Sequence, residues 1–222
     1  MFFSMIKLRQ GIYPHDISHL ARQSGYQTHQ RIWNLFSDTP DRKRDFIYRH
    51  ETSDGWPTFY TVSHRKPMNL HGIWEIALKK YNPILRPGQR LGFALRANPI
   101  RSRRDENAKQ KRHDVVMEEK LKLKREGKKL ELPDIVQKQG LGWLQERAES
   151  YGFSISANNV RVDGYQQHKL FKRNNIPIMF STLDFNGILT VTEPDVFITK
   201  CLYTGFGPAK GFGCGLMLVR RI

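Results

Sequence analysis

The sequence is poor in cysteine and has no long apolar run. Its two cysteines, Cys201 and Cys214, lie far apart with no Cys-x-x-Cys or Cys–His spacing. This pattern argues against a zinc site and against a disulfide framework, and it fits a cytoplasmic protein. No stretch approaches the ~20 apolar residues of a membrane span, and residues 1–7 lack the pattern of a signal peptide. We therefore expect neither a membrane partner nor export.

Acidic residues are also scarce relative to basic ones. The chain has 37 Lys and Arg against 21 Asp and Glu, which gives a net charge of +16 and a pI near 10.0. Such a charge destabilises a compact fold by self-repulsion. A protein with this charge usually binds nucleic acid or an anionic membrane. Because no membrane segment is found, nucleic acid is the favoured partner. The 39% of hydrophobic residues is enough for a buried core.

Hydrophobic periodicity predicts two tandem ferredoxin-like domains of the α+β class, at residues 1–88 and 89–222. Each half has the element order β-α-β-β-α-β, without a residue-level repeat between them. In the first half the second helix is weakly indicated, with room for it only at 68–71. The elements that we expect are strands at 1–9, 44–50, 58–63, 73–78, 90–100, 153–163, 176–183, 187–192 and 215–219, and helices at 25–36, 134–149 and 196–203.

Two basic segments interrupt the second half. Residues 101–130 carry 12 Lys and Arg against 6 Asp and Glu, and we expect a long, partly mobile insertion whose simplest interpretation is a solvated arm. Within it, 118–125 is compatible with a helix, because acidic and basic residues alternate at helical spacing. Residues 168–175 are expected to form a basic hairpin tip.

The segment Gly205–Gly215 has five glycines in eleven residues and one cation, Lys210. Glycine allows φ > 0 and close backbone approach. The sequence leaves two interpretations open: a cradle of backbone N–H groups for a phosphate, or a tight connection between a helix and a strand.

Several motifs, in the right order and over nearly the whole chain, resemble the CasE family of CRISPR-repeat endoribonucleases from type I-E systems. The chain departs from the family in the length and basicity of 101–130 and at Phe212. The matching stretches are Tyr26-x-x-His29-Gln30, Trp33-x-Leu35-Phe36, Leu95-Arg96-Ala97-Asn98-Pro99, Lys111-Arg112-His113, Trp143-Leu144-x-x-Arg147, Gly187–Val191 and Gly205-x-Gly207-Pro208-Ala209-Lys210-x-x-Gly213-Cys214-Gly215-Leu216.

This resemblance implies two ferredoxin-like domains and a metal-independent endoribonuclease that needs no cofactor. Members of the family cleave CRISPR precursor RNA at the 3′ base of each repeat hairpin. The expected products carry a 2′,3′-cyclic phosphate and a 5′-hydroxyl. The protein would stay bound to the mature guide RNA as a subunit of the Cascade complex, so its partners would be the repeat hairpin and the other Cascade subunits.

Metal-free RNA cleavage needs a base for the 2′-OH, an acid for the 5′-O leaving group and stabilisation of charge on the phosphorane. From pattern alone, His29 beside an apolar helix stripe is more often a packed core residue; the family motif makes it the main catalytic candidate. We expect His29 to transfer a proton, as acid to the 5′-O, because a histidine side chain ordinarily has a pKa near working pH. Tyr26, one turn earlier, would orient the 2′-OH or the phosphate. Which of the two is acid or base stays open.

Lys210 is a candidate for stabilising the phosphate charge. Basic side chains of the hairpin tip would enter the groove at the stem base, and those after the Arg-Ala-Asn-Pro motif would bind flanking RNA. His113 and His168 are expected to be exposed and without a catalytic role, and both cysteines to be buried. The residues that we expect to bind RNA are Lys169, Lys172, Arg173, Arg96, Arg101, Arg103, Gly207, Gly211 and Gly213.

A second function is compatible with the charge and the two domains. A non-catalytic RNA-binding protein of a ribonucleoprotein would have the same composition, but it leaves the Tyr26/His29 pair unexplained. Cleavage of a repeat hairpin in EDTA distinguishes the two functions.

Overall fold

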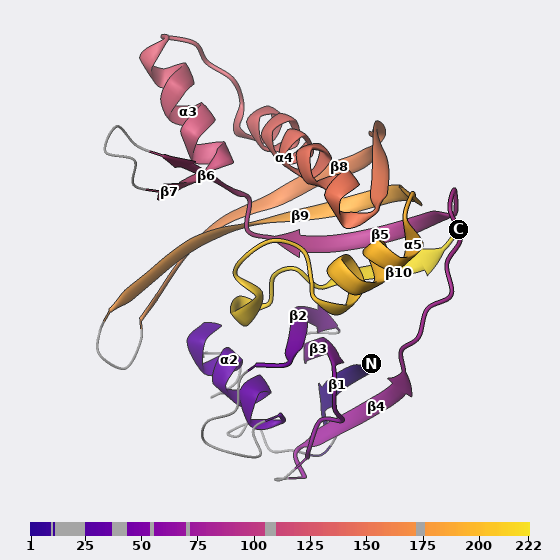
Figure 1. Cartoon of the computed structure of the whole chain (residues 1–222). Helices are drawn as coiled ribbons and strands as arrows, with labels where there is room; N and C mark the ends of the chain where they lie inside the picture. Colours follow the sequence, from indigo (N-terminus) through magenta and orange to yellow (C-terminus); the bar gives the residue numbers. More distant parts are fainter. Residues whose placement is uncertain are drawn as a thin grey trace.

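We analysed a computed structural model of the chain. It describes residues 1–9, 11, 25–36, 44–53, 56–69, 72–104, 110–171 and 176–222. For residues 25–29 the description covers the backbone alone. Two antiparallel sheets of four strands each make up its centre (Figure 1).

The first sheet has the strand order β2-β3-β1-β4. It consists of β1 (Phe2–Leu8), β2 (Phe46–Ser53), β3 (Trp56–Ser63) and β4 (Trp74–Lys80), with helix α2 (Gly25–Asn34) between β1 and β2. Alternate residues of β1 and β2 pack with Ile32, Leu35 and Phe36 in one core, because successive side chains of a strand point to opposite faces. Strand β2 lies at one edge of this sheet, which matters for the site described below.

The second sheet repeats this arrangement with the order β10-β5-β9-β8. Its strands are β5 (Arg90–Ala97), β8 (Phe153–Phe171), β9 (Pro177–Val191) and β10 (Met217–Arg221). Helix α4 (Leu132–Ala148) and the short η1 (Glu149–Tyr151) precede β8, while α5 (Pro194–Val196) and the π-helical η2 (Phe197–Tyr203) follow β9. Both sheets have the ferredoxin-like strand order, so the predicted α+β fold is confirmed.

The sheets are formed by residues 2–80 and 90–221, and a domain boundary at residue 88 stays a prediction. A small core joins them, in which Ile47 and Val62 of the first sheet pack with Leu216. Their buried contact fixes the relative position of the two sheets.

The basic insertion differs from our expectation. It forms a two-stranded ribbon, β6 (Ile100–Arg104) and β7 (Gln110–Asp114), followed by helix α3 (Val115–Arg125). Val115, Val116 and Leu123 are buried in the core of the second sheet, and Asp114 caps the helix through the N–H groups of Val116 and Met117. The prediction of a mobile, solvated arm is therefore wrong for this part. Charge dominates its composition, but three apolar residues at helical spacing are enough to dock it.

Smaller differences concern the ends of elements. Helix α4 starts at Leu132, with Glu131 as its N-cap residue, so Asp134 lies in the first turn and is not the cap that we predicted. In the first unit Lys66–Asn69 is irregular, and the second half of the weakly indicated helix at 68–71 lies outside the described residues. Strands β8 and β9 are longer than predicted and pair as a hairpin, whose far end curves away from the other two strands of the second sheet (Figure 1). No helix in the described ranges is long and apolar enough to span a bilayer.

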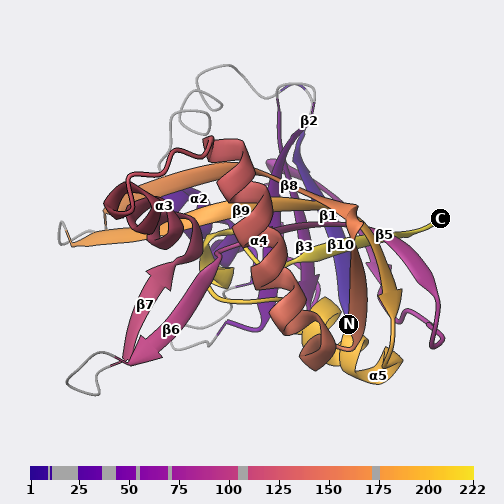
Figure 2. The same cartoon turned by 90° about the horizontal axis from the view of Figure 1, so that it is seen from above.

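Helix α4 crosses the second sheet and is buried along one side (Figure 2). Trp143 and Leu144 are fully buried there. Gly140 faces the sheet so closely that an added Cβ would lie 2.5 Å from Val162 Cγ1 and 3.0 Å from Leu183 Cδ1. At Gly142, further along the same helix, an added Cβ would have no atom within 4 Å.

These two glycines predict opposite effects of alanine on stability. Gly140→Ala overpacks the helix–sheet contact, which typically costs about 1–3 kcal/mol. Gly142→Ala gains roughly 0.5–1 kcal/mol of helix propensity. Denaturant unfolding should therefore show a lower midpoint for Gly140→Ala and a higher one for Gly142→Ala. A higher midpoint for Gly140→Ala would contradict the close packing of α4.

Candidate functional site

The glycine-rich loop Gly205–Gly215 docks on edge strand β2 of the first sheet. Cβ atoms added at Gly205 and Gly213 would lie 3.1 Å from Ile47 Cδ1 and 3.3 Å from Tyr48 Cε2. Since Ile47 and Tyr48 are neighbours on a strand, their side chains point to opposite faces, and the loop wraps around this edge. The Tyr48 hydroxyl also donates a hydrogen bond to the Gly211 carbonyl over 3.0 Å.

The two ends of the loop are held by backbone hydrogen bonds. The Phe206 N–H donates to Gly215 O over 2.8 Å, and the Gly215 N–H donates to Arg96 O over 2.7 Å. Gly215 has φ +89°, and an added Cβ would lie 2.7 Å from Phe206 O, so this position requires glycine. These N–H groups are not available to a phosphate. The ends of the loop are therefore a tight connection between a helix and a strand. Only the backbone N–H groups in the middle of the loop are left as a possible phosphate cradle.

The middle of the loop carries a cation without an acidic partner. Ala209 is left-handed, with φ 58°, and the turn η3 (Lys210–Phe212) follows it. Lys210 is half-buried, and no acid in the described part of the chain forms an ion pair with it. Burial, and secondly the nearby Arg44 guanidinium, lowers the pKa of Lys210. Two cations near each other without an acid favour the binding of an anion.

Helix α2 lies against η3. The expectation that the helix with Tyr26 and His29 meets the glycine loop is therefore confirmed for the two elements, although the side chains of these two residues are outside the described ones. The helix is anchored by Ile32, which is fully buried. Strand β8 also contacts α2, so helix, loop and long hairpin converge (Figure 1).

Arg96 connects the two sheets rather than pointing to solvent. Its Nε and NH2 groups each donate to a carboxylate oxygen of Asp184 over 2.9 Å, and its NH1 group donates to His50 O over 3.0 Å. A bidentate Arg–carboxylate pair is a strong and directional contact. Arg49 of the first sheet lies 3.8 Å from the same carboxylate. RNA binding by Arg96 stays a prediction, and the contacts give this residue a structural role.

Two motifs of the sequence interlock with each other. Asn98 is buried, and its amide donates to Ser181 O over 2.7 Å. Ile100 O accepts hydrogen bonds from Trp143 Nε1 and Arg147 NH2 over 2.9 and 3.2 Å. The Arg-Ala-Asn-Pro and Trp-Leu-x-x-Arg stretches thus hold the start of β6 between β9 and α4. Both motifs therefore have a structural role in the second unit.

The structure also describes four further residues with a predicted RNA-binding role, Arg101, Arg103, Lys169 and Gly207. Arg101 pairs with Glu146, and Arg103 pairs with Glu118. Lys169 is exposed on β8, with its ammonium 5.4 Å from the centre of the Phe171 ring. Gly207, with φ +72°, packs near Trp143. Lys172 and Arg173 lie outside the described residues, and RNA binding by this whole group remains a prediction.

A stack of three rings was missed by the sequence analysis. His168 lies 4.6 Å from Phe180, and Phe180 lies 5.1 Å from Phe212, between ring centres. His168 is half-buried, with its Nε2 2.9 Å from Thr182 Oγ1, and His113 on β7 is half-buried as well, so the prediction that these two histidines are exposed is wrong. His168 and Phe180 are directly opposite each other in the β8–β9 register. The β8–β9 register determines this pairing, and it was not known from the sequence.

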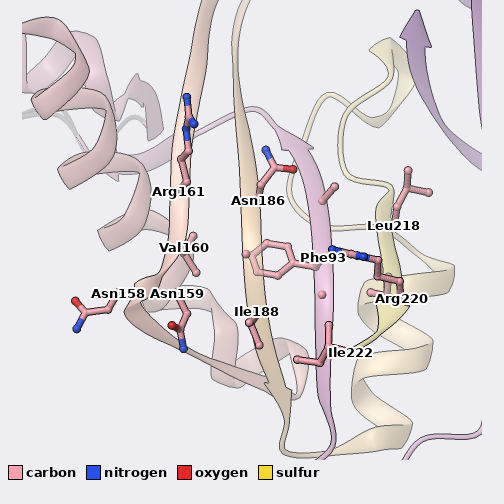
Figure 3. A pocket seen from close by; sticks show the side chains of 14 residues that line it. Phe93, Asn158, Asn159, Val160, Arg161, Asn186, Ile188, Leu218, Arg220 and Ile222 are labelled. Atoms are coloured by element: carbon pink, nitrogen blue, oxygen red, sulfur yellow. The ribbon is translucent and has the colours of Figure 1, made fainter. Parts of the chain in front are cut away.

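A pocket of about 640 Å³ lies elsewhere, on the second sheet (Figure 3). Its polar lining includes Arg161, Asn186 and Arg220. Arg161 pairs with Asp163 over 2.7 Å. Among its lining residues Phe93 is the one aromatic side chain, and it belongs to the buried core. The pocket includes neither the loop nor α2, so it is not the centre of this site.

The described ranges contain no group of three His, Cys, Asp or Glu side chains that could hold a metal ion. Metal independence and the lack of a cofactor remain predictions.

Both cysteines are free and buried, as predicted. Burial raises the pKa of the Cys214 thiol to about 12, which makes it unreactive.

Comparison with known proteins decides the family. The family model described as "CRISPR associated protein" matches residues 1–221. The chain belongs to the CRISPR-associated protein family. Among curated relatives, it is 30% identical over 199 residues to the CRISPR system Cascade subunit CasE of Escherichia coli K12, covering 86% of this chain and 89% of that one. The resemblance to CasE is therefore confirmed.

A second CRISPR-associated relative, the endoribonuclease Cse3 of Thermus thermophilus, is 28% identical over 157 residues, 64% of this chain and 60% of that one. A structure of the CRISPR endoribonuclease Cse3 bound to 19 nt RNA superposes with a TM-score of 0.72 at 23% identity, over 99% of this chain and 100% of that one. Cas6e from Escherichia coli K-12 gives 0.61 at 22%, over 100% of both chains. At these identities the structures establish the shared fold.

Two histidines next to the loop, His50 and His168, should make the folding stability of this CRISPR-associated protein depend on pH. Burial, and secondly Arg96, lowers the pKa of both His50 and His168 below the ordinary 6.5. The unfolded chain therefore binds more protons below pH 6.5, so the folded state loses stability as the pH falls. The melting temperature should be lower at pH 5.5 than at pH 7.5. In a His50→Gln/His168→Gln double variant this pH difference should shrink; an undiminished difference would show that other groups cause it.

Proposed function

We propose that this protein is a metal-independent endoribonuclease that cleaves CRISPR precursor RNA at the 3′ base of the repeat hairpin. It leaves a 2′,3′-cyclic phosphate and a 5′-hydroxyl, and it stays bound to the guide RNA as a Cascade subunit. One observation carries this proposal: in a chain 30% identical to CasE, the helix with Tyr26 and His29 lies against a turn whose lysine lacks an acidic partner among the described residues.

The proposed chemistry follows from the groups that this convergence provides. The 2′-OH releases its proton to water, the 2′-oxygen forms a bond to the adjacent phosphorus, and the bond from phosphorus to the 5′-oxygen breaks. His29 gives its proton to the departing 5′-oxygen, and Tyr26 orients the 2′-OH or the phosphate. Lys210 stabilises the extra negative charge of the phosphorane, in a half-buried place where a charge interaction is stronger than in water. Alignment of the attacking oxygen supplies a further part of the rate.

RNA binding in this proposal rests on charge and on the long hairpin. The chain carries +16 net charge, and the hairpin β8–β9 extends beyond the second sheet toward α2 (Figure 1). Lys169 on β8 would contact phosphates at the stem base, and so would Lys172 and Arg173, which follow β8 in the sequence. A-form RNA has a deep and narrow major groove, so these contacts recognise shape and backbone more than sequence. The predicted cytoplasmic location belongs to the same proposal.

The direct test is cleavage of a labelled repeat hairpin in EDTA. Wild type should cut once, at the 3′ base of the stem. Loss of a proton-transfer group lowers the rate by roughly 10²–10⁴-fold, so His29→Ala should bind the hairpin with similar affinity and cut at least 100-fold more slowly. His113→Ala, which changes a histidine of strand β7, is the matched control and should cut normally. Binding by wild type without cleavage would favour the non-catalytic RNA-binding alternative, and a requirement for Mg²⁺ would contradict the mechanism.

Lys210→Gln tests the phosphate-stabilising role. The single-turnover cleavage rate should fall by about 10-fold or more, because a positive charge next to the phosphorane stabilises the transition state more than the ground state. The dissociation constant of an uncleavable hairpin should change by only a few fold. Lys200→Gln, an exposed lysine of η2, is the matched control with no expected effect. If the whole loss lies in the dissociation constant, Lys210 only binds RNA.

A further inference from the structure

The two parts of the proposed site come from different units of the fold. Helix α2 lies between β1 and β2 of the first sheet in the sequence, whereas the turn η3 lies between η2 and β10 of the second. The distance between the helix and the turn is therefore set by contacts between the units. Tyr48 of β2 makes one of these contacts, through a side chain that neither the motifs nor the proposed chemistry assigns a role.

The Tyr48 side chain holds the turn directly. Its hydroxyl donates a hydrogen bond to Gly211 O over 3.0 Å, and Gly211 follows Lys210 in the turn. Its ring also lies against the end of the turn, because a Cβ added at Gly213 would be 3.3 Å from Tyr48 Cε2. One side chain of the first sheet thus contacts the residue after Lys210 and the residue that ends the turn.

The hydrogen bond fixes one peptide group of the turn at both of its ends. Its carbonyl, Gly211 O, accepts from the tyrosine, and its N–H, that of Phe212, donates to Ala209 O over 2.8 Å. Ala209 has φ 58° and is the one residue other than glycine with positive φ in the described part of the chain. A left-handed alanine persists where its surroundings hold it. The conformation of the turn therefore depends on contacts such as the one with Tyr48.

The other end of this connection reaches the helix. Phe46 precedes Tyr48 on the same face of β2, and the centres of their rings are 6.5 Å apart. Phe46 stacks on Phe36, with 4.4 Å between ring centres, and lies 5.8 Å from the ring of Trp33 in α2. A series of packed aromatic rings therefore joins the helix to the tyrosine. Because protein interiors are close-packed, such a series keeps its two ends at a fixed separation.

Tyr48 is too buried to take part in the reaction itself. It is 2% exposed, so its side chain is not open to RNA. Burial raises the pKa of its hydroxyl, which therefore keeps its proton and stays a donor throughout the neutral pH range. Any influence of Tyr48 on cleavage must act through the groups that it holds.

We propose that Tyr48 is a positioning residue, which holds the turn Lys210–Phe212 at the separation from α2 that places the Lys210 ammonium at the scissile phosphate. This inference rests on the proposed function, because it takes from it the role of Lys210. Without the hydroxyl, the peptide group after Gly211 is free to rotate, and the lysine loses its alignment. The positive charge that attracts RNA remains, so the loss falls on the rate and not on binding.

The test is single-turnover cleavage of the labelled repeat hairpin in EDTA by Tyr48→Phe, which removes only the hydroxyl. The rate should fall by about 3- to 10-fold, as expected for the loss of one hydrogen bond. The dissociation constant of a hairpin with a 2′-deoxy sugar at the cleavage position should stay within about two-fold, because no charge is lost. In a Lys210→Gln background Tyr48→Phe should cause almost no further loss, since two residues that act through one group are not additive.

Tyr203→Phe is the matched control. The Tyr203 hydroxyl also donates to a backbone carbonyl over 3.0 Å, but its acceptor is Tyr81 O, so the bond joins η2 to the segment after β4 and not to the turn. This variant should cleave at the wild-type rate. Replacing Tyr48 by para-aminophenylalanine, which keeps a donor at the same place, should restore the rate that Tyr48→Phe loses.

Four results would overturn the inference: a wild-type rate in Tyr48→Phe, a loss that lies in the dissociation constant, an undiminished loss in the Lys210→Gln background, or an equal loss in Tyr203→Phe. If Tyr48→Phe folds poorly, para-fluorophenylalanine at this position gives the same comparison, because its fluorine fills the space of the hydroxyl without donating. Failure of these variants to behave as expected, with normal cleavage by wild type, removes only the role of Tyr48. Failure of wild type to cleave removes the proposed function.

Discussion

The contacts of Arg96 are the constraint on which the site depends. Its guanidinium binds Asp184 within the second sheet and reaches His50 O in the first, while its own carbonyl accepts the N–H of Gly215. One residue therefore fixes the edge of the first sheet, the centre of the second sheet and the end of the glycine loop. Side-chain burial at Ile47, Val62 and Leu216 completes this junction. Without it, α2 and η3 would belong to two units with no defined relative position.

This junction separates the two roles of the glycine loop. The ends of the loop are built into the fold by backbone hydrogen bonds, and Phe206 is buried against Trp143 and Tyr151. The middle of the loop, the turn Lys210–Phe212, lies against α2, and its Phe212 ring stacks on Phe180 of the hairpin. A rigid base of this kind positions functional groups more accurately than a free loop does, which suits a reaction that depends on alignment.

Much of the fold was predictable from the sequence, because apolar and polar residues alternate in segments such as 44–50 and 58–63 and helix α4 has an apolar side. The insertion was not, since its charge hides the three apolar residues that dock α3. The site was predictable only in part. Tyr26, His29 and Lys210 came from motifs, whereas the stacking of His168 on Phe180 depends on the register of a long hairpin. Local periodicity does not contain that register, and exposure of His168 was wrongly inferred from its basic neighbours.

The central claim is that α2, the turn Lys210–Phe212 and the β8–β9 hairpin meet at one phosphate of the RNA. A crystal structure of wild type with a repeat hairpin, blocked by a 2′-deoxy sugar at the cleavage position, measures this most directly. We predict that the scissile phosphate lies between His29 and Lys210, with its stem against the hairpin. A scissile phosphate on the sheet face drawn in Figure 3, away from α2 and the loop, would contradict the account.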